Sequence, residues 1–355
     1  MVRSTPNDPL NSQNNNSASD RDATKNPAGN LSLPDSLEAQ SQVDQLLDQV
    51  NQQIEMLAFD NPAPGLLRQM VQSLTDPRRA TRIRLIETLS QIGEVATPYL
   101  LEGVGQHSEA VVRRACCNAL TNIGDATSIP GLITALLQDD DIGVKSAAAG
   151  ALAKVGAPAF DAIREVLASE EASESCKGHA AWALASMGSE VSDQLYRTMS
   201  DPSPTVRTAV VGAIAQLAQK QLAQKQLSQK QLGHKDPNQK QLAAPSASVA
   251  SGATSKVSGT LTMLTEALSD QSPEVRIEAA ANLARLNCQK AYQPLIACLK
   301  DTDSSVRKAA VLALAKLGRV EAIEAISPLT QDLDSDVRRV ADLAIAQLDA
   351  KKEMA

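Results

Sequence analysis

A unit of about 31 residues recurs eight times along this 355-residue chain, and this periodicity limits the fold more than any other feature. One basic residue marks the same position in every unit. These anchor residues are Arg82, Arg113, Lys145, Lys177, Arg207, Arg276, Arg307 and Arg338. They are 30 to 32 residues apart, except for one interval of 69 residues that holds a normal unit and an insertion. A repeat of this length is typical of a supersecondary unit that buries its apolar side only by stacking on its neighbours.

Each anchor begins a helix with one apolar face. Small residues lie three and four positions after the anchor in several units, and large apolar residues lie seven and ten positions after it in all eight. These offsets follow the 3.6-residue period of an amphipathic helix. An Asp or Ser four positions before the anchor predicts an N-cap in six units: Asp141, Ser173, Ser203, Ser272, Asp303 and Asp334. A residue eleven positions after it predicts a left-handed helix end in six units: Gly93, Gly124, Gly156, Gly188, Asn287 and Gly318.

An acidic residue recurs six positions before the anchor in seven of the eight units. The acids are Asp76, Asp139, Glu171, Asp201, Asp270, Asp301 and Asp332, and the second unit has His107 instead. An acid and a base at fixed offsets in stacked units form ion pairs within one unit or between adjacent units. We interpret both columns as structural, so no anchor is assigned a catalytic role.

These patterns predict an all-α fold, an α-solenoid of about eight helical hairpins. Residues 1–35 are rich in Asn, Ser, Asp and Pro and are expected to form a disordered tail, followed by an N-terminal capping helix at 36–60. Residues 61–219 hold repeats 1–5 and residues 259–350 hold repeats 6–8. Between them, 220–258 is expected to be a low-complexity insertion, a partly helical extension that leads into a flexible linker.

Composition excludes several classes of function. The net charge of −7 gives no basic surface for a nucleic acid, and no run of about 18 apolar residues predicts a membrane span. The five cysteines contain no C-x-x-C pair and are interpreted as buried free thiols of a reducing compartment, so a cytoplasmic location is expected. There is no Gly-rich phosphate loop and no H-E-x-x-H metal motif, and we expect no metal site.

The single tryptophan, Trp182, marks a candidate binding surface. Neighbouring units have Gly150 and Gly212 at its position, and Gly178 lies one turn earlier on its own helix. Either the bare backbone leaves a shallow recess for a planar ligand or a partner side chain, or the indole folds down and fills the space. The candidate ligand- or partner-binding residues are Trp182, His179, Gly150, Gly178, Gly212, Arg114 and Asn118. No catalytic residue is assigned, and nearby Cys176 is interpreted as a packing residue.

Units such as HSEAVVRRACCNALTNIGDATSIPGLITALL and SSVRKAAVLALAKLGRVEAIEAISPLT resemble the short HEAT-like repeats of cyanobacterial phycobilisome lyase subunits and of the phycobilisome degradation protein. The resemblance covers about Pro64 to Ala218 and Gly259 to Leu348. The pattern also resembles deoxyhypusine hydroxylase, but that enzyme requires His-Glu pairs, and this sequence has no His-Glu dipeptide.

The resemblance implies a protein-interaction scaffold that binds phycobiliprotein subunits or their bilin pigment, most like a degradation adaptor. A second possibility is a bilin lyase subunit that attaches or removes a linear tetrapyrrole at a phycobiliprotein cysteine, paired with a sister HEAT-repeat subunit. A third is a general protein-binding solenoid with no pigment role. No permanently bound cofactor is expected, and phycocyanobilin would be a transient ligand.

Overall fold

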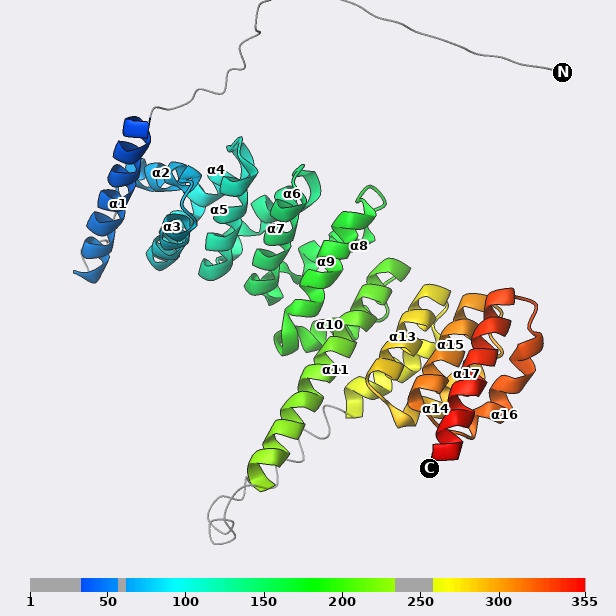
Figure 1. The fold of residues 1–355 in the computed structure, drawn as a ribbon. Coiled ribbons are helices and arrows are strands. Elements are labelled where there is room, and N and C mark those ends of the chain that lie inside the picture. The colour runs from blue at the N-terminus through cyan, green and yellow to red at the C-terminus, as the bar shows by residue number, and fades with distance from the viewer. Residues whose placement is uncertain (1–32, 57–61, 234–257, 355) are drawn as a thin grey trace, which may run out of the picture. The chain divides into compact units, whose positions relative to one another are not determined.

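The computed structural model describes residues 33–56, 62–233 and 258–354, and every regular element in these ranges is a helix (Figure 1). This confirms the all-α solenoid of helical hairpins. Most of the expected N-terminal tail and most of the expected linker lie outside the described residues. No helix in the described ranges is both long and apolar enough to cross a bilayer.

The chain divides into two units, Met1–Gln42 and Val43–Ala355. The described part of the first unit is the beginning of helix α1 (Leu33–Glu55), and the rest of α1 belongs to the second. Within the second unit, Leu47 and Val50 of α1 are fully buried in the common core. The Asp44 carboxylate accepts a 2.7 Å hydrogen bond from Arg78, so α1 is tied to the first repeat by both apolar and charged contacts.

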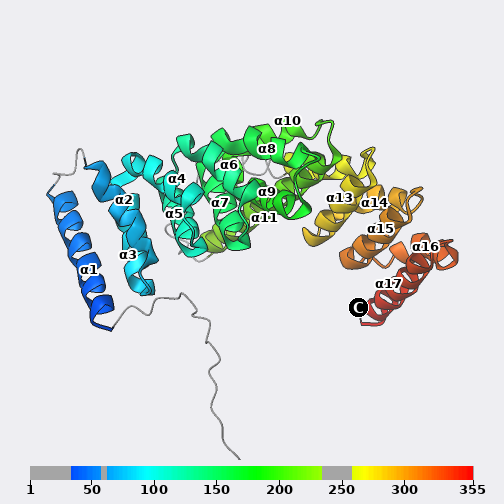
Figure 2. The ribbon, with the colours of Figure 1, turned by 90° about the horizontal axis from the view of Figure 1, so that it is seen from above.

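The second unit contains the repeats, each made of two antiparallel helices, and short 3₁₀ turns accompany most of them. The first helices are α2 (Pro64–Gln72), α4 (Thr97–Gln106), α6 (Ile129–Gln138), α8 (Phe160–Ala168), α10 (Ser192–Thr198), a helix over 258–266, α14 (Tyr292–Cys298) and α16 (Ala322–Ile326). The second helices are α3 (Arg79–Ile92), α5 (Ala110–Ile123), α7 (Ile142–Val155), α9 (Glu174–Ser186), α11 (Pro204–Gly233), α13 (Pro273–Arg285), α15 (Ser304–Leu317) and α17 (Ser335–Met354). Consecutive second helices contact one another along the whole series (Figures 1 and 2).

Helix α11 is longer than the other second helices. It continues past residue 220, where the insertion was expected to begin, and ends at Gly233. Its QKQLx repeat does not match the helical period, and Leu227 is 61% exposed. Beyond the insertion, α13 packs directly on α11, and Arg207 donates to both carboxylate oxygens of Asp270 at 2.7 and 2.9 Å. The fifth and sixth repeats are therefore stacked despite the residues between them.

The predicted helix ends are confirmed at the C-terminal side and nearly all confirmed at the N-terminal side. Among the described residues, positive φ angles occur at the five predicted glycines and at Asn287, with φ of 50°. Five of the six predicted N-caps accept a hydrogen bond from a backbone amide of the first turn. Ser272 also occupies the N-cap position, before Pro273 at N1, but its side chain accepts no hydrogen bond from a backbone amide, and its hydroxyl donates to the Glu274 carboxylate.

Four of the six anchor arginines join two repeats through three of their nitrogens. In Arg307, Nη1 donates to the carbonyl oxygens of Asp301 and Thr302 at 2.8 and 3.2 Å, in the turn of its own repeat. Its Nε and Nη2 donate to the two oxygens of Asp332 in the next repeat, both at 2.7 Å. Arg113, Arg207 and Arg276 repeat this arrangement. The predicted ion pairs exist at these four anchors, and each runs from one repeat to the following one.

Two lysines interrupt this series of ion pairs in the third and fourth repeats. The Nζ of Lys145 lies 3.7 Å from the Cys176 sulfur, and the Nζ of Lys177 lies 3.5 Å from Glu174 of its own helix. Asp201, which a fourth-repeat arginine would bind, accepts from Arg164 of α8 at 3.2 Å. A lysine has a single charged nitrogen, so it cannot bind a turn and a carboxylate together as the arginine fork does.

The ion pairs predict a stability difference between two arginine variants. Arg276 and Asp301 are 13% and 12% exposed, so Arg276→Ala leaves a largely buried carboxylate without its cation, and we expect the free energy of unfolding to fall by about 2–4 kcal/mol. Arg82 makes only the two turn hydrogen bonds, because His107 replaces the acid of the next repeat, and Arg82→Ala should cost about 1 kcal/mol. Equal losses of unfolding free energy in the two variants, measured by urea titration, would contradict the structural role of the Arg276–Asp301 ion pair.

Stability should also fall at acidic pH through the same carboxylates. The hydrogen bonds from Arg307 hold the pKa of Asp332 below its ordinary value, although partial burial opposes this. The stabilisation is complete above the unfolded value of about 3.9 and is lost as the pH falls through the lower pKa of the folded state. In Asp332→Asn, the free energy of unfolding should therefore fall less steeply with pH below about pH 4 than in the wild type. The exposed Asp349→Asn serves as a control that keeps the wild-type slope.

Candidate functional site

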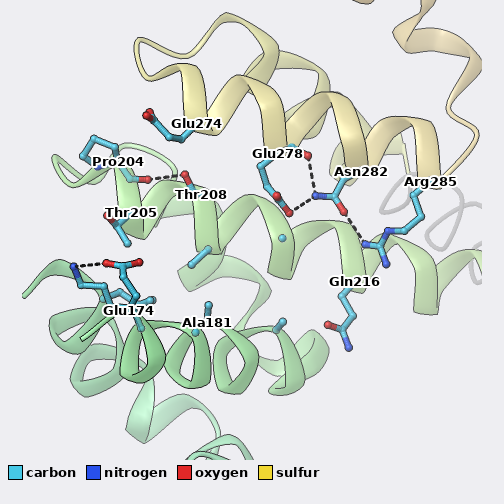
Figure 3. A pocket seen from close by; sticks show the side chains of 16 residues that line it. Glu174, Ala181, Pro204, Thr205, Thr208, Gln216, Glu274, Glu278, Asn282 and Arg285 are labelled. Carbon is cyan, nitrogen blue, oxygen red and sulfur yellow. Dashed lines mark hydrogen bonds and ion pairs between the residues drawn. The ribbon is translucent and has the colours of Figure 1, made fainter. Parts of the chain in front are cut away.

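A groove with a volume of about 860 Å³ lies between α9, α11 and α13 (Figure 3). We call it the Asn282 groove. Its position coincides with the interruption of the arginine forks, because Lys177 of α9 pairs with Glu174 of its own helix and Asp201 accepts from Arg164 of α8. Its volume is within the range of pockets that hold small molecules.

Small side chains form one side of the Asn282 groove. Gly178, Ala181 and Ala185 of α9 face Ala209 and Gly212 of α11. A Cβ atom added to Gly178 would meet nothing within 4 Å, and one added to Gly212 would meet only a carboxylate oxygen of Glu278 at 3.5 Å. The glycines therefore leave open space between the helices, which a flat apolar molecule or an inserted side chain can occupy.

A polar triad on α13 forms the opposite wall. Asn282 is 5% exposed, and its Nδ2 donates to the Glu278 carboxylate at 2.7 Å. Its Oδ1 accepts from Arg285 at 2.7 Å, and Arg285 also donates to Gln219 at 3.0 Å. Within the described residues neither Glu278 nor Arg285 forms a salt bridge with an opposite charge. Asn282 thus orients a carboxylate and a guanidinium whose charges are available to a ligand (Figure 3).

Sequence analysis missed this triad although a signal was present. The position six residues after the anchor is alanine in six of the eight units, and Asn282 and Thr88 are the two exceptions. Both are buried, and Thr88 donates to Asn51 of α1. A polar residue in a buried alanine column needs a specific partner, so the column predicts a special site wherever it is interrupted.

The structure places the residues predicted around Trp182 on four different second helices, α5, α7, α9 and α11. Trp182 is 53% exposed, and its indole lies beyond 4 Å from a Cβ built on Gly150, Gly178 or Gly212. The indole therefore does not fill the space over these glycines. Gly178 and Gly212 line the Asn282 groove, whereas Trp182 and Gly150 are not among its lining residues.

The remaining predicted residues lie farther from the groove. His179 is half-buried, and its Nδ1 donates to the backbone oxygen of Ser175 at 2.7 Å, which fixes the ring on its own helix. Arg114 and Asn118 are exposed on α5. Helix α7 packs against both α5 and α9, so it separates these two side chains from Trp182.

All five cysteines are free and buried. Burial raises the pKa of the Cys117 thiol to about 12 and also raises the pKa of Cys116, so neither is a ready nucleophile. No cluster of three or more metal-ligating side chains occurs in the ranges that the structure covers.

Comparisons with known proteins give one curated relative and many distant structural neighbours. The chain is 28% identical over 220 residues to the bilin biosynthesis protein MpeU of Synechococcus sp. strain WH8020, which covers 62% of this chain and 73% of that protein. Human deoxyhypusine hydroxylase is 19% identical, with 80% of this chain and 96% of that chain covered and a TM-score of 0.32. Yeast importin-beta Kap95p is 15% identical, with 91% and 45% covered and a TM-score of 0.40.

Two family models match the repeats of this chain. A model of HEAT repeats matches residues 97–175 and 261–346, and a second model of the HEAT repeat matches residues 192–221. Together these ranges cover more than half of the chain and include α13 and the first part of α11, whereas most of α9 lies between the matched ranges. The chain belongs to the HEAT-repeat proteins.

Proposed function

We propose that this HEAT-repeat chain is a scaffold that binds phycobiliproteins or their bilin pigment, and that the Asn282 groove receives the pigment. The observation that carries the proposal is a groove of about 860 Å³ in which Asn282 orients the Glu278 carboxylate and the Arg285 guanidinium; Glu174, Lys177 and Glu274 are its other charged lining residues. A linear tetrapyrrole is a long conjugated molecule with pyrrole N–H donors and acidic propionate groups. Its chemistry matches that of the groove.

Each wall of the groove has a partner on such a ligand. The small residues of α9 and α11 provide a flat surface for the conjugated system. The Glu278 carboxylate accepts hydrogen bonds from pyrrole N–H groups, and Arg285 pairs with a propionate. The similarity to a protein named for bilin biosynthesis supports the same ligand class.

Two versions of this function differ in whether the chain takes part in pigment transfer. We favour a binding adaptor, of the kind that assists antenna dismantling, because no cysteine is among the residues that line the groove. The alternative is a bilin lyase subunit, paired with a sister HEAT-repeat chain. In that case the groove only orients the pigment, and the phycobiliprotein supplies the thiol. The biosynthetic name of the relative supports this second version.

Phycocyanobilin titration tests the groove directly. Wild-type protein should red-shift and sharpen the pigment absorption, and Gly178→Leu should weaken binding by about tenfold or more because its side chain enters the groove. Gly150→Leu is the matched control, since it adds the same side chain at an open helical position outside the groove. Equal effects of the two variants, or an unchanged spectrum with wild-type protein, would overturn pigment binding in this groove.

An experiment with a phycobiliprotein that lacks its pigment distinguishes the binding adaptor from the lyase subunit. Covalent transfer of phycocyanobilin to its cysteine in the presence of this chain would establish the lyase and exclude the pure adaptor. Stable binding of the phycobiliprotein without transfer would support the adaptor. Failure to bind either pigment or phycobiliprotein would reduce the chain to a general protein-binding solenoid and refute the proposal.

Trp182 gives a further prediction about the surface that binds the phycobiliprotein. Because its side chain is 53% exposed, Trp182→Ala should lower the free energy of unfolding by less than about 1 kcal/mol. An exposed indole is typical of a binding hot spot, so the same change should weaken phycobiliprotein binding by tenfold or more, about 1.4 kcal/mol. Calorimetric titration and thermal unfolding of one preparation provide both quantities. A large drop in stability with unchanged affinity would assign Trp182 to packing.

A further inference from the structure

The last three repeats expose a stripe of apolar side chains on their second helices. Five positions after the anchor lie Ala281, Leu312 and Leu343, all exposed, with Leu312 at 54% and Leu343 at 65%. The first two repeats have Glu87 and Asn118 at this position. Large apolar side chains that remain exposed at one register of adjacent helices indicate a binding surface rather than scattered surface residues.

A second groove runs beside this stripe, between α13 and α15, with a volume of about 340 Å³. We call it the Leu312 groove. Its lining is mostly apolar and includes Ile277, Ala281, Ala309 and Leu312. The volume is at the lower limit for small-molecule pockets but is ample for an inserted large apolar side chain.

The charges at the Leu312 groove have one sign. Lys308 and Lys316 are its only charged lining residues, and α15 contains no Asp or Glu. The Nζ of Lys308 lies 3.7 Å from Asp336, whereas Lys316 forms no salt bridge with any described residue. An occupant with acidic groups beside its apolar side chains complements this rim.

The spacing of the stripe identifies the shape of the occupant. Adjacent packed helices are about 8–10 Å apart, so the side chains at the shared register recur at about that distance. A helix rises about 1.5 Å per residue, and residues seven apart on one face are therefore separated by about 10.5 Å. A helix that crosses α13, α15 and α17 thus places an apolar residue against each of them.

We propose that the Leu312 groove and the adjoining stripe bind an acidic amphipathic helix of a partner protein, with apolar residues at every seventh position. Its central apolar side chain enters the groove beside Leu312, and the next packs on Leu343. Its carboxylates pair with Lys316 and Lys308 at the rim. This surface is separate from the Asn282 groove, so it stands even if the chain binds no pigment.

A labelled synthetic helix about three heptads long, with leucine at every seventh position and flanking glutamates, tests the proposal by fluorescence anisotropy. The full chain should bind it, and Leu312→Ser and Lys316→Glu should each weaken binding by about tenfold or more. Both positions are exposed, so the fold is retained. The matched controls are Leu333→Ser, at a turn leucine that is 99% exposed, and Lys300→Glu, at an exposed turn lysine, and neither should change the affinity.

Several results would overturn the proposal. The first is no binding of the acidic helix, and the second is equal binding of a version with lysines in place of the glutamates. Dimerisation of the chain that Leu343→Ser abolishes would assign the stripe to a second copy of this protein. Binding to anionic vesicles that requires Leu312, without peptide binding, would assign it to a lipid surface.

Discussion

The arginine fork that joins neighbouring repeats is the interaction on which the rest of the structure depends. One guanidinium holds the turn of its own repeat through two carbonyl oxygens and the aspartate of the next repeat through two further hydrogen bonds. The same aspartate also accepts the backbone amide two residues later, as Asp332 does from Asp334. Each fork therefore fixes the geometry of two turns and one interface, and repeats stacked in this way need few other polar contacts.

Where lysine replaces the arginine in the fourth repeat, the fork between the second helices is interrupted, and Asp201 of the next repeat is bound instead by Arg164 of α8. The Nζ of Lys177 lies 3.5 Å from Glu174 of its own helix, so Lys177 does not take the place of the arginine that would bind Asp201. The Asn282 groove opens between α9 and α11, and small residues on both keep it open. A binding site placed at an interrupted link costs the solenoid only one interface, because each repeat contacts only its neighbours.

Sequence predicted the features that local geometry controls. A residue that must adopt a positive φ is glycine or asparagine, and all six predicted positions do so. The direction of the ion pairs was left open, because offsets along the chain do not say which repeat the arginine reaches. Ser272 occupies its predicted N-cap position, but its side chain caps no backbone amide and its hydroxyl donates to Glu274. Sequence also left open whether the Trp182 indole is buried, since this depends on how it packs against neighbouring helices. Asn282 was overlooked, although it interrupts a column of alanines.

Helix α13 contributes to both grooves with different chemistry. Glu278, Asn282 and Arg285 face the Asn282 groove, whereas Ile277, Ala281 and Ala284 face the Leu312 groove. Both sets follow the helical period, so each forms its own stripe along one helix. The arginine fork uses only the N-terminal end of the helix, and the two stripes are therefore free to differ without altering the stacking. A HEAT-repeat chain can in this way present a charged site and an apolar site one helix apart.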